Sequence, residues 1–285
     1  MEHLTNTALD KPQTGRQIMI NEKEFIRGEL FPNICDMRVG TEAHLDYDEQ
    51  LSVPQKQHVS IYSKSEYLCS VFNIISNNPD KQFTYVSHNS DMIINTCNIP
   101  SNLYRWFAQN RATYQKRIYS IPIGLENTHW FPYKHDVMLQ EYDVNQKRKI
   151  KAFAQFDPKT HTERKAALDT VDKQSCDVYF GLNGQKDNHL LFCQNLSKYA
   201  FCLCPRGNGI DTHRIWEAIY MGCIPICKSY PAHEFSDKLP ILFVEKWSDV
   251  TERLLTDTYQ SFDQCLFNSD ILKISYWRNK INNKM

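Results

Sequence analysis

One segment in the second half of the chain brings glycine, arginine and histidine to the start of a helical pattern. Residues 204–217 read C-P-R-G-N-G-I-D-T-H-R-I-W-E and follow an apolar run. Glycines between a strand and a helix let a ligand approach the backbone, and the helix N-terminus offers free N–H groups and positive potential. Arg206 adds donors that match phosphate oxygens. The segment therefore predicts an anion site, although it has neither a P-loop nor a dinucleotide-binding glycine pattern.

Other residues of this segment have expected positions on the helix. We expect Asp211 to cap it, with His213 and Arg214 in the first turn and Glu217 one turn later, where it could bond a ligand hydroxyl. In the alternative interpretation Gly207 only opens an ordinary turn, and Arg214 and Glu217 form a surface ion pair. We favour the anion site, because capping does not explain why arginine, histidine and glycine converge on one helix start.

A candidate general base lies at the end of a predicted strand in the first half. Residues 85–91 read Y-V-S-H-N-S-D, and open α/β sheets bind ligands where strands end. Asp91 is the first choice for the base, and His88 is a further catalytic candidate. His88 and Asn89, together with Ser90, would hold an acceptor. The alternative is that these polar residues only cap the next segment.

A second candidate base is Glu126, which follows another predicted strand. His129 and Trp130 come soon after it and could form an interdomain wall or a platform for a sugar. Cys202, Cys204 and other cysteines lie inside apolar strands without the loop spacing of zinc knuckles, so we expect them to be packed thiols.

Strands that alternate with helices must position these residues. Such alternation indicates βαβ units and a parallel sheet covered on both faces, so the predicted fold class is α/β. The predicted strands are 58–62, 82–88, 117–124, 148–156, 176–180, 200–204, 223–227 and 241–244. The predicted helices are 63–78, 101–110, 160–173, 187–199 and 211–222.

The motif then carries a resemblance to a known family. Residues 204–226, CPRGNGIDTHRIWEAIYMGCIPI, resemble the signature segment of exostosin-type (family 47) glycosyltransferases. The resemblance implies a GT-B architecture, with two Rossmann-like domains that face each other across a cleft. The loop 157–164 is similar to the loop after the first donor-domain strand in that family. The implied donor-binding residues are Arg164, Arg206, Asn208, Gly209, Asp211, Thr212, His213, Arg214 and Glu217.

The resemblance also implies roles and substrates. Arg206, Asn208 and Gly209 would face the nucleotide diphosphate, with Arg164 on its opposite side. Thr212 and Arg214 would face phosphates or sugar, and Glu217 the ribose hydroxyls. The implied reaction is metal-independent transfer, with inversion, from a UDP-sugar to a glycan acceptor, without a cofactor. In size the chain is more loosely similar to small soluble exostosin-like xylosyltransferases of large algal viruses, which suggests xylose.

Two alternatives stay open. Asp46 and Asp48 spell the Asp-x-Asp motif by which GT-A transferases hold a metal, but only one doubtful strand precedes them, so no metal site is expected. The other alternative is a non-catalytic protein that binds a nucleotide sugar or a carbohydrate.

Composition limits the remaining possibilities. The chain has 285 residues, 41% of them hydrophobic, and 33 basic against 33 acidic residues. The hydrophobic fraction excludes a disordered or coiled-coil protein. The equal numbers of basic and acidic residues exclude the positive field of a protein that binds duplex nucleic acid. No leader or membrane span is apparent, so we expect a cytoplasmic protein. The expected domains are an acceptor domain at 1–145, a donor domain at 146–245 and C-terminal helices at 246–285 that pack on the first domain.

Overall fold

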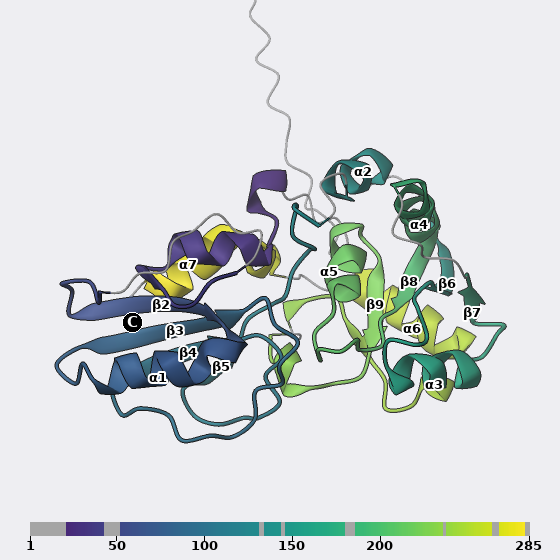
Figure 1. The fold of residues 1–285 in the computed structure, drawn as a ribbon. Helices are drawn as coiled ribbons and strands as arrows, with labels where there is room; N and C mark the ends of the chain where they lie inside the picture. The colour runs from purple at the N-terminus through teal and green to yellow at the C-terminus, as the bar shows by residue number, and fades with distance from the viewer. Residues whose placement is uncertain are drawn as a thin grey trace, which may run out of the picture.

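The computed structural model contains two separate parallel β-sheets flanked by helices (Figure 1), which confirms the predicted α/β class and its two-domain arrangement. Each sheet has five strands. The structure describes residues 21–42, 52–130, 134–143, 146–179, 186–235, 238–263 and 268–282. Asp46 and Asp48 lie outside these ranges.

The first sheet has its strands in chain order, β1-β2-β3-β4-β5. Its central strands carry almost no exposed side chains because helices cover both faces: α1 (Leu68–Ser76) lies on one face and α7 (Ile274–Asn282) on the other (Figure 1). The strands are β1 (Met37–Arg38), β2 (His58–Lys64), β3 (Gln82–His88), β4 (Leu103–Ala108) and β5 (Ile118–Ser120).

Strand β4 corrects the sequence prediction, which placed a helix at 101–110. The segment is rich in large aromatic residues, which favour a pleated, buried surface, and strand β3 offers it a partner over five register positions. Trp106 is fully buried there, stacks on Tyr85 and donates a hydrogen bond from Nε1 to Ser87 Oγ at 2.8 Å. Pairing with β3 therefore overrides the apparent helical period.

The second sheet has the order β10-β9-β8-β6-β7. Helices α3 and α6 pack on one face, and α4 and α5 on the other, as the two clusters of buried residues show. The strands are β6 (Lys149–Ala154), β7 (Cys176–Val178), β8 (Tyr199–Leu203), β9 (Ile224–Cys227) and β10 (Leu242–Phe243). The helices are α2 (Lys134–Glu141), α3 (Thr162–Thr170), α4 (Lys186–Lys198), α5 (His213–Tyr220) and α6 (Glu252–Asp263).

The strand order of the second sheet creates a switch point. The connection that leaves β6 runs to one side of the sheet, and the connection that leaves β8 runs to the other. Loops diverge at such a point, and open α/β sheets bind their ligands there, beyond the strand ends. The loops here are 155–161, which covers the first part of the predicted loop 157–164, and 204–212, which contains the glycine turn; Arg164 itself lies in the first turn of helix α3.

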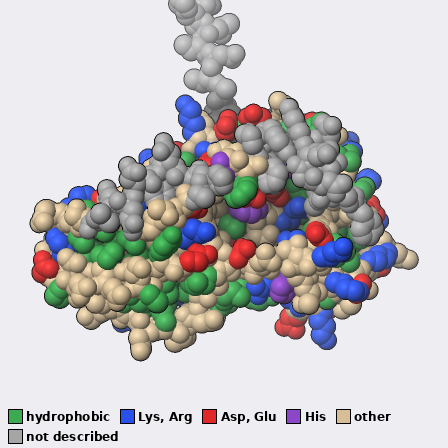
Figure 2. Space-filling model, viewed as in Figure 1, with side chains coloured by type: hydrophobic (Ala, Val, Ile, Leu, Met, Phe, Trp, Pro, Cys, Tyr) green, Lys and Arg blue, Asp and Glu red, His purple; other side chains and the backbone are tan. Residues whose placement is uncertain are grey.

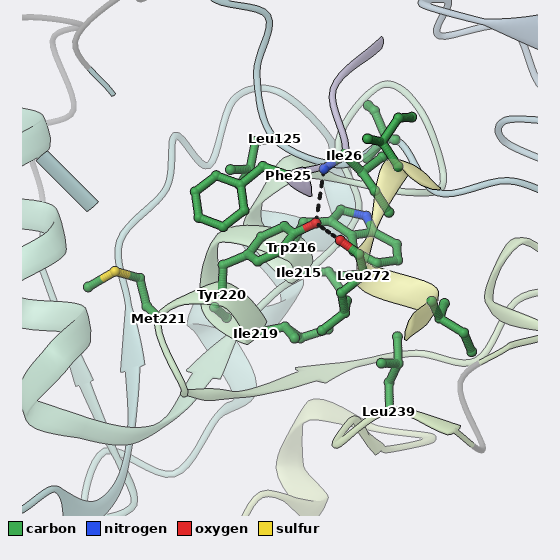
Figure 3. Packing of buried hydrophobic residues seen from close by; sticks show 14 of the residues in the cluster. Phe25, Ile26, Leu125, Ile215, Trp216, Ile219, Tyr220, Met221, Leu239 and Leu272 are labelled. Carbon is green, nitrogen blue, oxygen red and sulfur yellow. Dashed lines mark hydrogen bonds between the residues drawn. The ribbon is translucent and has the colours of Figure 1, made fainter. Parts of the chain in front are cut away.

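The two domains share a buried core (Figure 3). Phe25 and Ile26 from the first domain pack with Tyr220 from the second, and their rings and aliphatic chains are almost completely buried. The Tyr220 hydroxyl donates to Leu272 O at 2.6 Å and accepts from the Ile26 N–H at 3.1 Å. This hydroxyl therefore joins the N-terminal segment, helix α5 and the segment before α7.

The C-terminal helices divide between the domains, which corrects the prediction that they pack on the first. Helix α7 does so, against the 3-10 helix η2 (Gly28–Ile34) and β3. Helix α6 instead packs against β6, because Leu255 belongs to the apolar cluster that contains Ala152 and Phe201. The expected domain boundary at 145/146 falls between β5 and β6 and stays a prediction. The other 3-10 helices are η1 (Glu22–Glu24), η3 (Ser65–Tyr67), η4 (Pro231–His233), η6 (Trp247–Asp249) and η7 (Ser269–Leu272).

Candidate active site

The glycine turn after β8 gathers arginine side chains. Arg164 donates from Nε to Arg206 O at 3.1 Å, and Arg206 donates from Nη2 to Asn208 O at 2.8 Å. A Cβ on Gly207 would stand 3.1 Å from Arg164 Nη2, so this glycine allows the guanidinium to lie against the backbone. Burial, and then the nearby charge of Arg214, lower the pKa of Arg164. Three guanidinium groups thus lie at the switch point.

Glu163 fastens this turn, and the sequence prediction did not assign it to the site. Its Oε1 accepts the Arg206 N–H at 3.2 Å, and its Oε2 accepts the Tyr230 hydroxyl at 2.7 Å. His161, which precedes helix α3, is the N-cap and accepts the Glu163 N–H through Nδ1 at 3.1 Å. The carboxylate therefore holds the loops after β6, β8 and β9 together.

Arg214 and Glu217 form the i,i+3 ion pair of the alternative interpretation, but inside the protein rather than at its surface. Their Nε–Oε2 distance is 3.0 Å, and the guanidinium lies 4.0 Å from the Phe192 ring centroid. Glu217 is only 5% exposed. Its carboxylate holds Arg214 in place, and its contact with ribose hydroxyls stays a prediction.

Asp211 is not the helix cap, which corrects the sequence prediction. Thr212 occupies the N-cap position and makes no side-chain cap. The buried Asp211 carboxylate accepts the Ile123 N–H at 2.7 Å and the Trp216 Nε1–H at 3.0 Å. Burial raises its pKa to about 6. Because Ile123 belongs to the first domain, this carboxylate is a contact between domains.

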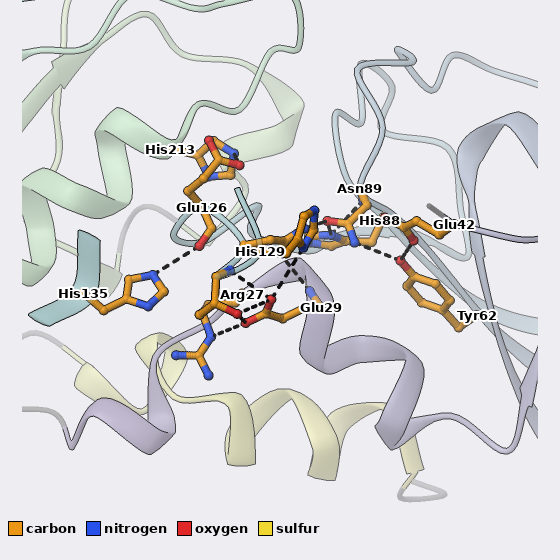
Figure 4. Close-up of polar contacts among 12 residues, drawn as sticks. Arg27, Glu29, Glu42, Tyr62, His88, Asn89, Glu126, His129, His135 and His213 are labelled. Atoms are coloured by element: carbon orange, nitrogen blue, oxygen red, sulfur yellow. Dashed lines mark hydrogen bonds and ion pairs between the residues drawn. The ribbon is translucent and has the colours of Figure 1, made fainter. Parts of the chain in front are cut away.

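Two carboxylates of the first domain, Glu126 and Asp91, reach the donor-side segment. The His213 Nδ1–H donates to Gly124 O at 2.8 Å, which leaves Nε2 at 3.5 Å from Glu126 Oε1 (Figure 4). Asp91, which is exposed, accepts a hydrogen bond at Oδ2 from Asn208 Nδ2 at 3.3 Å. The structure therefore brings both predicted base candidates to the segment that carries the arginines.

The buried side chain of Asn110 connects the segment after β3 to the glycine turn after β8, and the sequence prediction did not include it. Its side chain donates from Nδ2 to Ser90 O at 2.8 Å and accepts the Asp211 N–H at 2.9 Å. The residue is 1% exposed and has a left-handed φ of 56°. A Cβ on Gly209 would come within 2.7 Å of this amide, so the turn needs glycine there.

His88 is a buried positioning residue, which corrects its prediction as a catalytic one. Its Nε2–H donates to Pro122 O at 2.9 Å, and its Nδ1 accepts the Asn89 N–H at 2.8 Å. The ring is completely buried, and burial lowers its pKa to about 4. With both ring nitrogens engaged, His88 shapes the end of β3 and has no open atom for a proton transfer.

The predicted acceptor residues line one side of this region (Figure 4). Asn89 donates from Nδ2 to the Tyr62 hydroxyl at 3.1 Å, and Tyr62 donates to Glu42 Oε2 at 2.9 Å. Ser90 is buried and donates to Glu66 Oε1 at 3.0 Å. Burial raises the pKa of Glu42. The carboxylates of Glu42 and Glu66 come from segments that carry no motif, so sequence reasoning could not assign them.

His129 and Trp130 lie beyond Glu126, with ring centroids 5.1 Å apart. Trp130 is 58% exposed, as a platform for a sugar requires. Glu29 holds this segment by accepting the Thr128 N–H and hydroxyl at 2.9 Å. Figure 2 shows acidic, basic and histidine side chains together in the middle of this face, where the two halves of the molecule meet.

The described residues show neither a metal-ligand cluster nor a membrane-spanning helix. They contain no group of three or more His, Cys, Asp or Glu side chains that could hold a metal ion. The cysteines described are free thiols, and Cys202 and Cys204 are buried as expected. Within the same ranges, no helix is long and apolar enough to cross a membrane.

Comparison with known proteins identifies the family. The model of the Exostosin GT47 domain matches residues 71–239, which is more than half of the chain. The chain belongs to the exostosin GT47 family. It is therefore a glycosyltransferase, as the resemblance of residues 204–226 implied, and the matched range includes both base candidates and the whole glycine turn.

Two further comparisons accompany the GT47 match. A solved structure titled "Crystal Structure of alpha1,3-Fucosyltransferase" aligns over 85% of this chain and 83% of its own, with 12% sequence identity and a TM-score of 0.37. No curated protein sequence matches the chain. In this GT47 protein the loops that follow the two parallel sheets touch, through Asp91 and Asn208, in a two-domain α/β arrangement.

Proposed function

We propose that the protein transfers a sugar from a UDP-sugar to a hydroxyl group of a glycan, with inversion and without a metal. The observation that carries the proposal is that Asp91 and Glu126, from the first domain, contact the segment that holds the donor-side arginines. In the proposal, acceptor activation and departure of the diphosphate therefore take place at one junction, where the loops of the first domain that carry Asp91 and Glu126 meet the segment 204–214 of the second.

The donor side provides for the departing diphosphate. Transfer leaves negative charge on a phosphate oxygen, and donors already aimed at that charge lower the barrier by about 3 kcal/mol each. Arg164 and Arg206 present guanidinium groups beside the start of helix α5, and Glu163 fixes the turn that carries one of them. In the proposal these charges replace the metal ion on which GT-A enzymes depend.

The acceptor side provides a base. Inversion by direct displacement needs a carboxylate that takes the acceptor proton while the hydroxyl attacks the anomeric carbon. Asp91 is the proposed base, since it is exposed and its contact with Asn208 keeps it beside the turn. Glu126, beside His213, is the alternative base. Trp130 and Asn89 would hold the acceptor sugar.

The experiment measures transfer from a panel of UDP-sugars, UDP-xylose among them, to oligosaccharide acceptors, with the anomeric configuration of the product determined by NMR. D91N should lower kcat by about 10² to 10⁴, the usual share of a general base. A larger loss in E126Q than in D91N would move the role to Glu126. E245Q, at an exposed site outside the junction, is the matched control.

The same experiment separates the alternatives. If D91N and E126Q both keep full turnover, neither carboxylate is the base and the proposed mechanism fails. If donor binds but no acceptor is glycosylated, the chain acts as a nucleotide-sugar or carbohydrate-binding protein. Loss of activity in EDTA, restored by Mn²⁺, would favour a metal-dependent reaction at Asp46 and Asp48. For cellular location the proposal is the cytoplasm.

A further inference from the structure

A cavity lies between the domains and shares no residue with the candidate active site. Its volume is about 290 Å³, and its walls come from strands β4 and β5, the segment 234–238 and helix α7. The Ser120 hydroxyl in its wall donates to Pro231 O at 2.7 Å, which ties the first domain to the second. Any ligand here would contact both domains.

The cavity carries excess positive charge. Arg105 is 5% exposed and lies 5.0 Å from the Tyr104 ring centroid, while the lysines at 238 and 280 reach the cavity from the other domain and from α7. Among described residues, neither lysine has a carboxylate within ion-pair distance. The acidic lining residue, Glu234, is already bonded by Arg111 and by the Ser120 N–H.

Aromatic rings supply the remaining walls. Tyr119 is 42% exposed and packs on Phe107 with ring centroids 5.8 Å apart. Tyr276 and Trp277 on helix α7 meet edge to face at 5.3 Å, and the Lys280 ammonium lies 5.6 Å from the Tyr276 ring centroid. A ligand that satisfies this lining has a flat apolar face and an anionic group.

We propose that this cavity binds a sugar ring that bears a carboxylate or a sulfate. The C–H face of a pyranose packs against aromatic rings, and the anionic group would pair with Lys238, Lys280 and Arg105. The volume lies at the lower end of the range of ligand pockets, about 300 to 1,000 Å³, which suits one ring. The choice of a sugar rests on the proposed function, because a glycosyltransferase meets glycans.

The test measures binding of three probes to the full chain by titration calorimetry: methyl glucuronide, methyl glucoside and inorganic sulfate. Methyl glucuronide should bind at least about tenfold more tightly than either of the others, because only it offers both ring and charge. The K238Q/K280Q double variant should lose about tenfold in affinity for it. Both lysines lie at the edge of the cavity, so the fold should persist.

Matched variants make the result decisive. K165Q/K173Q removes the same charge from the opposite part of the second domain, and its affinity for methyl glucuronide should be unchanged. R206A should lose UDP binding and keep methyl glucuronide binding, which shows that the two sites are separate. Equal binding of glucoside and glucuronide, or unchanged affinity in K238Q/K280Q, overturns the proposal. A wild-type protein that binds UDP but not the glucuronide refutes this inference alone.

Discussion

Asn110 should decide how firmly the two domains are held together. N110A removes the bond to Ser90 O and the bond from the Asp211 N–H, and both atoms are then left without these partners in the junction. Each such loss costs about 1–3 kcal/mol. Alanine also tolerates the left-handed φ of 56° poorly, which adds about 1 kcal/mol. We therefore expect N110A to lower the free energy of unfolding by about 3–7 kcal/mol.

N110G is the matched control for N110A, because it loses the same hydrogen bonds but accepts the left-handed φ. It should be about 1 kcal/mol more stable than N110A in urea unfolding. Without the Asn110 side chain, the segment that carries Asp91 should shift relative to the glycine turn. Both variants should therefore also show a kcat lower by about tenfold or more. A loss of less than about 1 kcal/mol in N110A, with normal kcat, would refute the role of this amide.

Three further predictions concern the same junction. G209A should destabilise the protein by about 1–3 kcal/mol because its Cβ would press on the Asn110 amide within 2.7 Å. G207A, whose nearest neighbour is the end of the Arg164 side chain at 3.1 Å, should cost less; urea unfolding of both variants compares them. The Asp211 pKa, raised to about 6, makes the folded state bind an extra proton between about pH 4 and 6, so this carboxyl group contributes stability below pH 4 that is lost as the pH rises through 6. The stability difference between wild type and D211N should therefore rise by about 2 kcal/mol from pH 7 to pH 4, and a constant difference in denaturation curves would contradict this assignment. R214A should lower the free energy of unfolding by about 3–5 kcal/mol, because it leaves the Glu217 carboxylate buried without its partner; a thermal melt equal to that of wild type would show that the pair is dispensable.

Local patterns predicted the elements that carry the donor side. The strand at 200–204, the glycine turn and the helix after it form one continuous signal, because strand, turn and helix N-terminus are set by neighbouring residues. The predicted strands at 82–88 and 223–227 are likewise present as β3 and β9. By contrast, the pattern of residues 101–110 predicts a helix where β4 lies, because the pairing of β4 with β3 is not encoded within those ten residues.

Contacts between distant segments account for what the sequence did not show. Asp211 looks like a cap from its position, but its partner Ile123 lies 88 residues away. Asn110 carries no motif, and its role appears only when the domains are brought together. His88 has the right residue type for catalysis, and burial removes it from that role. Residue type and spacing thus indicated the chemistry, whereas domain packing determined which side chains can perform it.

The most direct test of the donor site is titration of UDP into wild type and R206A at equal protein stability. Arg206 is partly exposed, and its guanidinium bonds only to carbonyl oxygens of its own turn among the described contacts, so its removal should leave the fold intact. The account predicts clear binding to wild type and a loss of at least about a hundredfold in R206A. Unchanged UDP affinity in a folded R206A would place the donor elsewhere and contradict the central claim.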